Sequence, residues 1–301
     1  MRSHRAGGTR RESLSDLLLR RKLAGRGAAR PPTFTVDLVE RLARSHRPAR
    51  TRAGYKTGSF ERFLAWTDQK QLTGRKLRSL VPRHAGRMLD VGAGDGSLTK
   101  HYDRPFREAV LLEPDERLRG RLAKWHPRRE IVGDTIEAFL RSDRREFDFI
   151  VASHVLQHVE RPYDVLYQLI DRLSPGGSLA LVMLDPKCDW HRYVEQFRER
   201  VSGDSTAPEI PWTDVADDLR RRGVPFEIEL IPAKLRPPSI EAMLTISDFA
   251  FASARALPDA LRGEIEEYLR QHVHDGRLVL SQDNKVLLIR KPSSTPESAA
   301  P

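Results

Sequence analysis

The stretch RMLDVGAGDGSLTK, residues 87–100, decides the fold of this 301-residue chain. Residues 88–91 are apolar enough for a buried strand, three glycines follow at once, and residues 97–102 can open a helix. Glycines between a strand and a helix let backbone N–H groups approach a ligand, because no Cβ stands in the way. This arrangement predicts a binding site for a nucleotide-type cofactor.

The spacing of the glycines indicates which cofactor is bound. A dinucleotide fingerprint that started at Gly92 would need its third glycine at position 97, where the chain has Ser97. The glycines instead recur at every second position, as Gly92, Gly94 and Gly96, and Asp90 precedes them. This pattern resembles motif I of the class I S-adenosylmethionine-dependent methyltransferases.

Acidic residues that follow the next apolar runs extend the resemblance. Glu113 ends the run 109–113 about twenty residues after the loop, where an acidic residue meets ribose hydroxyls in doubly wound folds. Asp134 follows the next run, and the resemblance implies that it reaches the adenine amino group. A fourth run ends at Ser153, and a Ser-Pro-Gly-Gly turn precedes a fifth strand at residues 178–184. Residues 75–185 are thus similar to one methyltransferase core, in order.

The resemblance implies an α/β fold with a Rossmann-like, seven-stranded, doubly wound sheet of the class I methyltransferase type. It also implies S-adenosyl-L-methionine as the cofactor. The residues that we expect to hold it are Asp90, Gly92, Gly94, Gly96, Glu113, Pro114, Asp134, Thr135 and Ser153.

Four segments follow from the patterns along the chain. We expect a basic, disordered arm at residues 1–32, an N-terminal helical lid at 33–80, the methyltransferase core at 81–291 and a disordered tail at 292–301. A helical insertion before the last strand is expected at about residues 235–275. Apolar side chains at helical spacing continue from Phe60 to Leu77 within the lid. Two apolar runs around a polar turn at residues 277–290 predict a closing hairpin.

Composition and charge exclude several classes of protein. The chain is 39% hydrophobic and has one cysteine, Cys188, so it uses no disulfide framework and fits a reducing cytosol. We find no stretch near the roughly 20 apolar residues of a membrane span and no secretory leader. We therefore expect a cytoplasmic protein, whose oligomeric state the sequence does not indicate.

The net charge of +10 belongs to the N-terminal arm. Residues 1–52 hold 13 Arg and one Lys against four acidic residues, so the remainder of the chain is neutral. Charge runs of this kind are usually solvated or disordered. The alternative is a contact with nucleic acid, a membrane or a partner, which keeps nucleic acid as a possible but not favoured partner.

Segments outside the core resemble histamine N-methyltransferase and its small-amine relatives. The segment 55–68 is similar to the N-terminal substrate helix of that family, where an acidic residue just after a Thr accepts the amine. Asp68 would hold that position with a shorter side chain, and otherwise it is an exposed helix carboxylate. The resemblance implies a substrate side of Tyr55, Phe63, Trp66, Trp190, Tyr193 and Gln282. An aromatic stripe such as that of Phe63 and Trp66 is otherwise usually part of a core.

Methyl transfer from a sulfonium is an in-line displacement, so the protein mainly aligns and desolvates the reacting groups. A base is needed only to make the acceptor neutral or to take its proton. The catalytic candidates are Asp68, for an amine, and His154 and His158 after strand four, for a hydroxyl. The alternative for His158 is packing beneath the cofactor. No metal site is expected, because the histidines are scattered and Cys188 has no ligand partner nearby.

The sequence therefore predicts an enzyme that transfers the methyl group of S-adenosylmethionine to a small molecule, with nitrogen favoured as the acceptor atom. Three alternatives stay open. They are a small-molecule O-methyltransferase with a histidine base, an RNA methyltransferase that uses the basic arm, and a cofactor-binding protein without activity. The turn of base-amino RNA enzymes, Asn/Asp-Pro-Pro-aromatic, is replaced by SHVL at residues 153–156. Cys188 follows strand five, however, where some RNA enzymes place a cysteine.

Overall fold

The structure is a computed structural model that describes residues 58–83, 86–203, 210–253 and 256–293. All of these residues belong to one compact unit. The basic arm, Tyr55 and the end of the tail from residue 294 lie outside the described residues.

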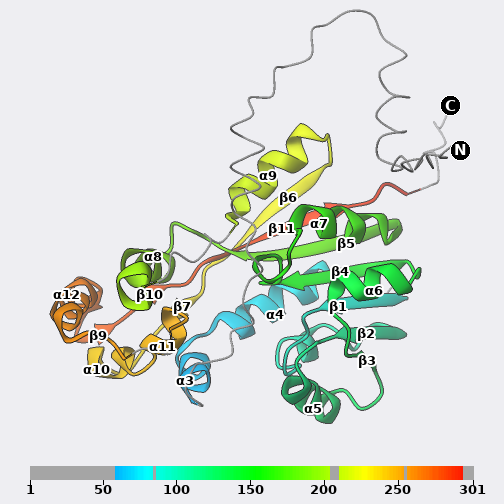
Figure 1. Ribbon diagram of the computed structural model, residues 1–301. Helices are drawn as coiled ribbons and strands as arrows, with labels where there is room; N and C mark the ends of the chain where they lie inside the picture. Colours follow the sequence, from blue (N-terminus) through cyan, green and yellow to red (C-terminus); the bar gives the residue numbers. More distant parts are fainter. Residues whose placement is uncertain (1–57, 84–85, 204–209, 254–255, 294–301) are drawn as a thin grey trace, which may run out of the picture. The chain divides into compact units, whose positions relative to one another are not determined.

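One seven-stranded sheet organises the described residues, in the order β3-β2-β1-β4-β5-β11-β6 (Figure 1). Its strands are β1 (Arg87–Val91), β2 (Glu108–Leu112), β3 (Glu130–Val132), β4 (Phe147–Ser153), β5 (Leu173–Leu184), β6 (Phe226–Ile231) and β11 (Asn284–Arg290). β11 runs antiparallel to both of its neighbours, whereas the pairs among β1 to β5 are parallel. The order reverses direction at β1 and β4, which confirms the predicted doubly wound sheet.

Helices cover both faces of this sheet. Successive side chains of β1 point to opposite faces of the sheet, so the strand contributes to two hydrophobic cores. Leu89 and Val91 lie in one core, and Met88 lies in the other. The core of Leu89 is shared with α6 (Ile136–Ser142), α7 (Pro162–Asp171) and α9 (Trp212–Arg221). The core of Met88 is shared with α4 (Gln69–Leu80) and α5 (Glu116–Trp125).

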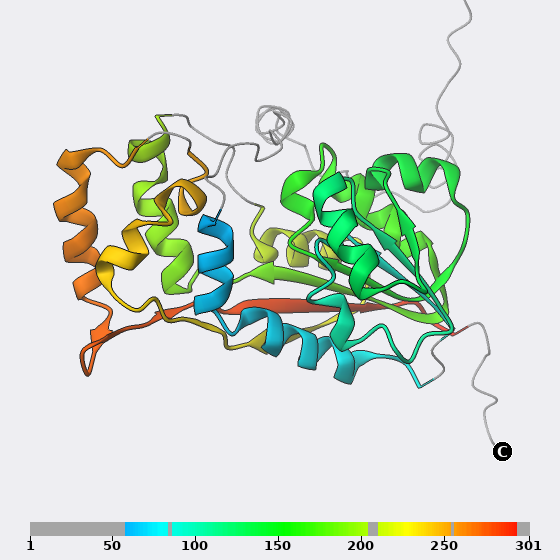
Figure 2. The ribbon, with the colours of Figure 1, turned by 90° about the horizontal axis from the view of Figure 1, so that it is seen from below.

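A third core holds a group of helices beyond one end of the sheet (Figures 1 and 2). Its helices are α3 (Ser59–Trp66), α8 (Asp189–Ser202), α10 (Ile240–Leu244), α11 (Ser247–Ala250) and α12 (Asp259–Arg270). Two small ladders join them, β7 (Lys234–Leu235) with β10 (Leu280–Ser281), and β8 (Val273–His274) with β9 (Arg277–Leu278). Helix α3 lies in the range of the expected lid, and α10 to α12 lie in the range of the expected insertion.

The helical spacing from Phe60 to Leu77 predicted a continuous helix, and this prediction is wrong. The helix is interrupted between α3, which ends at Trp66, and α4, which begins at Gln69. Thr67 is extended, with φ −108° and ψ 142°, and it bridges Leu235 of β7. The backbone N–H of Arg236 donates to the carbonyl of Trp66 at 2.8 Å. The extended break persists because β7 supplies the hydrogen bonds that the helix would otherwise have made.

The predicted closing hairpin is also wrong. Leu280 pairs with Leu235 in a ladder separate from the main sheet, whereas β11 pairs with β5 and β6. The polar residues between the two runs join two sheets: the N–H of Gln282 donates to Ala233, and the carbonyl of Asp283 accepts from Asp185, both at 2.8 Å. An apolar pattern shows that a segment is extended, but it does not show which strand becomes its neighbour.

Candidate active site

The site lies at the carboxyl edge of the sheet, where β1 and β4 end side by side. The glycine loop follows β1, and His154 follows β4. The order of the strands reverses at these two, and ligands of open α/β sheets bind at that point. The sheet therefore brings the predicted cofactor loop and a predicted catalytic residue to one edge.

Asp90 anchors the glycine loop from below. Its side chain is buried, and its Oδ2 accepts from the hydroxyls of Thr99, at 2.6 Å, and Tyr102, at 2.8 Å. Burial raises the pKa of Asp90 to about 6, although both hydrogen bonds act in the opposite direction. These contacts hold residues 97–102 in a turn with only a short 3-10 helix, Thr99–His101, so the helix predicted there is wrong.

The backbone of the loop packs against other residues at Gly96 and is unobstructed at Gly94. Gly94 and Gly96 have φ values of 60° and 78°, which favour glycine. A Cβ at Gly96 would lie 2.8 Å from atoms of His126 and Leu122, whereas a Cβ at Gly94 would meet nothing within 4 Å. The loop thus packs tightly at Gly96 and leaves its backbone open at Gly94, as the cradle of a ligand requires.

Glu113, at the end of β2, lies at the open side of the loop. Its Oε2 accepts from the N–H of Gly94 and its Oε1 from the N–H of Asp115, each at 2.9 Å. The side chain is buried, and this burial raises its pKa. Each carboxylate oxygen has a further lone pair that can accept from a ligand hydroxyl. The loop and Glu113 together therefore fit the sugar end of a nucleoside-type cofactor.

The other predicted cofactor residues lie at the ends of neighbouring strands. Pro114, Asp134 and Thr135 are exposed, and Ser153 is half-buried. The hydroxyl of Thr135 accepts from the N–H of Ala138 at 3.3 Å and caps α6, so it already has a structural partner.

His126 supports the loop from behind, and the sequence reasoning missed it. Its ring is buried between two acceptors: Nδ1 lies 3.0 Å from a carboxylate oxygen of Asp103, and Nε2 lies 3.2 Å from the carbonyl of Gly96. A neutral ring can donate to only one of these two acceptors, so this geometry favours the imidazolium. Despite its burial, the bonds to Asp103 and Gly96 raise the pKa of His126, and Arg129 also bonds Asp103 at 3.2 Å.

Most of the predicted aromatic substrate residues come together, but in a buried cluster. Phe63 lies with its ring centroid 5.0 Å from that of Trp190 and 4.7 Å from that of Phe249, and Trp190 lies 6.0 Å from Tyr193. Phe63, Trp190 and Tyr193 are buried, and Trp66 is half-buried. These rings form the contact of α3 with α8 and α11, which is the core role that an aromatic stripe usually has.

Asp68 is held by β7 and the residue after it. Its Oδ1 accepts from the N–H of Lys234, and its Oδ2 pairs with the guanidinium of Arg236, both at 2.7 Å. The carboxylate therefore fastens the break between α3 and α4 to β7. An amine that binds to Asp68 would have to share these partners.

Gln282 is linked to His154 through Gln69, in a polar network that the sequence reasoning did not predict. The amide of Gln69 lies 2.8 Å from Nε2 of His154 and donates to Asn284 at 3.1 Å, while Gln282 donates to Gln69 at 3.3 Å and accepts from Thr67. His158 is exposed, in the short 3-10 helix Leu156–His158. The network joins the start of α4, the end of β4 and the start of β11.

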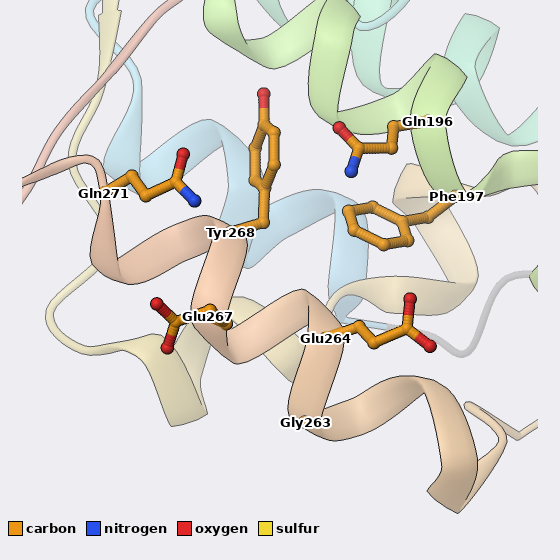
Figure 3. A pocket seen from close by; sticks show the side chains of 7 residues that line it. All are labelled: Gln196, Phe197, Gly263, Glu264, Glu267, Tyr268 and Gln271. Atoms are coloured by element: carbon orange, nitrogen blue, oxygen red, sulfur yellow. The ribbon is translucent and has the colours of Figure 1, made fainter.

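Two grooves lie away from the glycine loop. The larger, about 400 Å³, lies between α8 and α12 and is lined by Gln196, Phe197, Gly263, Glu264, Glu267, Tyr268 and Gln271 (Figure 3). Glu264, on its wall, pairs with Arg200 at 2.8 Å. The second, about 310 Å³, lies between α4 and β6. Neither is lined by a residue that the sequence predicted for the site.

Among the residues that the structure describes, no group of three or more His, Cys, Asp or Glu side chains could hold a metal ion. Over the same residues, no helix has the length and apolar character needed to cross a membrane. Cys188 is buried, and burial raises the pKa of its thiol to about 12. Its thiol is therefore a poor nucleophile near neutral pH.

Comparison with known proteins agrees with this geometry. The sequence pattern of the family described as a methyltransferase domain matches residues 49–222. A trans-aconitate 2-methyltransferase of Variovorax paradoxus is 26% identical over 67% of this chain and 76% of its own length. An uncharacterized methyltransferase of Mycobacterium tuberculosis is 34% identical, over 35% of this chain and 54% of its own length.

A solved structure has the same fold. It is that of a candidate methyltransferase of Bacillus halodurans, which aligns with 73% of this chain and 99% of its own length, with a TM-score of 0.51 and 19% identity. The predicted class I methyltransferase fold is thereby confirmed. None of these similarities selects the small-amine branch that the sequence resemblance suggested.

Alanine substitutions at two of the glycines should separate ligand binding from folding. Gly94→Ala should cost only the strain of a positive φ, about 1–2 kcal/mol, and should weaken binding of S-adenosylhomocysteine at least about tenfold, because its Cβ enters the open side. Gly96→Ala should cost about 2–5 kcal/mol, because overpacking against His126 and Leu122 adds to the strain. Denaturant unfolding and calorimetric titration measure both effects. Unchanged binding by Gly94→Ala would place the ligand elsewhere.

Stability should depend on pH through His126. A group whose pKa is raised by folding stabilises the protein. This stability is fully present at pH values below the pKa of the unfolded state, and it is lost as the pH rises through the pKa of the folded state. The free energy of unfolding of the wild type should therefore fall as the pH rises through the folded-state pKa of His126. The variant His126→Gln should remove this decline, at a cost of about 1–3 kcal/mol of stability at low pH.

His101→Gln is the matched control, because His101 lies against α4 at Gly74 and burial lowers its pKa. The decline should persist in this variant. Urea unfolding between pH 5 and 9 measures it, and a decline that survives His126→Gln would contradict the imidazolium assignment.

Proposed function

This chain belongs to the methyltransferase domain family as an S-adenosylmethionine-dependent methyltransferase, and we propose that it methylates a small molecule, with an amine nitrogen as the first candidate acceptor. One observation supports this proposal most directly. The open side of the glycine loop, His154 and the polar residues of α4 and β11 all lie at the same edge of the sheet. Helices α3 and α4 serve as the lid in this proposal, and α10 to α12 form the insertion.

The cofactor side uses the cradle around Gly94. Glu113 is the residue for the ribose hydroxyls, Gly92, Gly94 and Gly96 form the loop, and Asp90 holds the loop in place. In this proposal Asp134, which follows β3, and Ser153, which ends β4, complete the cofactor side. The bound cofactor supplies a methyl group already activated on a sulfonium. The protein then has to align the acceptor with that methyl group and exclude water.

The acceptor side uses residues of the lid and of the β4 and β11 ends. For an amine, Asp68 orients the N–H and counters the positive charge that develops on nitrogen, sharing its carboxylate with Arg236. For an acceptor that releases a proton, His154 is the base that takes it, because its Nε2 faces the network as an acceptor. The aromatic cluster of Phe63, Trp190 and Tyr193 holds α3 in place over this side.

An oxygen acceptor is the second candidate, and two observations favour it. The carboxylate of Asp68 already has two partners, which reduces its availability to an amine. The similarity to a trans-aconitate 2-methyltransferase extends over 76% of that relative, whose name gives a carboxylic acid as its substrate. An RNA methyltransferase that uses Cys188 as a nucleophile is a weaker candidate, because this thiol is buried and burial raises its pKa.

The proposed function is tested with the purified chain, methyl-labelled S-adenosylmethionine and an extract of its host, divided into small molecules, protein and RNA. Label should enter the small-molecule fraction. Label in RNA that is lost when residues 1–52 are removed would overturn the small-molecule acceptor. Binding of the cofactor without any transfer would favour a protein without activity.

Asp68 and Arg236 then decide between the two acceptors. If Asp68 receives an amine, Asp68→Ala should raise the KM of the identified acceptor about tenfold or more, while Arg236→Ala should leave it nearly unchanged. Asp68→Ala should also cost about 1–2 kcal/mol of stability, through loss of the bond to Lys234. An equal rise of KM in both variants and in the double variant would show that Asp68 acts only by fastening the lid.

A further inference from the structure

The amide of Gln69 has only one arrangement that satisfies its neighbours. Its nitrogen donates to the carbonyl oxygen of Asn284 at 3.1 Å, and its oxygen accepts from the amide nitrogen of Gln282 at 3.3 Å. Asn284 is fixed in turn, because its own nitrogen donates to the carbonyl of Gln282 at 2.9 Å. Gln282 and Asn284 are buried, so the orientation of Gln69 is set from inside the protein.

This arrangement determines the protonation of His154. The second N–H of Gln69 faces Nε2 of His154 at 2.8 Å, and an amide nitrogen can only donate. The Nε2 atom therefore carries a lone pair, and the proton of the neutral ring lies on Nδ1. The backbone of His154 is held as well, with φ 55° and its N–H donating to Val182 at 3.0 Å. A residue with a side chain seldom keeps this conformation without such support.

We propose that Gln69 is a positioning residue, which keeps His154 as the neutral Nδ1–H tautomer with Nε2 ready to accept a hydrogen bond from the methyl acceptor. An acceptor with an N–H or O–H replaces the Gln69 amide at Nε2, and the proton that it releases passes to that atom. Because Gln69 begins α4, the position of the lid and the tautomer of the base are set by one side chain. This inference rests on the proposed function for the acceptor alone, since the tautomer is a property of the protein by itself.

The tautomer is tested first, by the ¹⁵N chemical shifts of the ring nitrogens of His154 in the full chain at high pH. The signals are assigned by their loss in His154→Gln. The wild type should show a protonated Nδ1, and Gln69→Leu should move the ring toward the Nε2–H form. A wild-type ring already protonated on Nε2 would overturn the proposal, and this measurement needs no variant of Gln69 to fold.

Gln69→Glu gives the second test, with Gln71→Glu as its control. A carboxylate beside Nε2 favours the imidazolium, so the pKa of His154 should rise by about one unit or more. Gln71 lies on the same helix and is exposed, so the same change of charge there should leave the pKa within a few tenths of a unit. Equal shifts in the two variants would show a general effect of charge and would contradict the contact.

The activity of these variants separates the two proposals. With the acceptor found in the labelling experiment, the acidic limb of kcat/KM should move to higher pH in Gln69→Glu and stay in place in Gln71→Glu. An acidic limb that does not follow the measured pKa of His154 would overturn the role of this residue as the base. If no acceptor is methylated, the proposed function fails, whereas the ¹⁵N shifts still decide the tautomer.

Discussion

The buried carboxylate of Asp90 is the constraint on which the site depends. A carboxylate inside the sheet core is costly unless hydroxyls or cations satisfy it, and here Thr99 and Tyr102 supply both hydrogen bonds. These bonds draw the chain back beneath the loop within twelve residues, which forces the turn through glycines with positive φ. His126 fixes the far side of the turn through the carbonyl of Gly96. The backbone of Gly94 is left facing the open side.

The proposed acceptor side depends on a second set of tertiary hydrogen bonds. Thr67 and Asp68 leave the helical path and pair with β7, so that Gln69 starts α4 directly beside His154. The carboxyl edge of the sheet thus holds the backbone of the glycine loop and polar side chains from α4. An enzyme that moves an already activated methyl group mainly needs this alignment, because little proton chemistry is left for the protein.

The sheet and the cofactor loop could be predicted from the sequence because their signals are local. The apolar run of β1, glycines at every second position and Glu113 about twenty residues later all lie within the segment from β1 to the end of β2. The pairing of Leu280 with Leu235 and the contact of Gln69 with His154 join residues far apart in the chain, and no local pattern records them. His126 lies 30 residues from Gly96, in a segment that reads as an ordinary helix end. The aromatic stripe was predicted as a group, but its burial depends on α8 and α11, which the stripe itself does not specify.

A crystal structure of the full chain with S-adenosylhomocysteine would decide whether this edge of the sheet is the site of methyl transfer. The nucleoside should lie over the open side of Gly94, with its ribose hydroxyls on Glu113 and its sulfur toward the edge that holds His154. A ligand bound in the groove between α8 and α12, or one that leaves Glu113 without contact, would contradict the assignment of the glycine loop as the cofactor cradle.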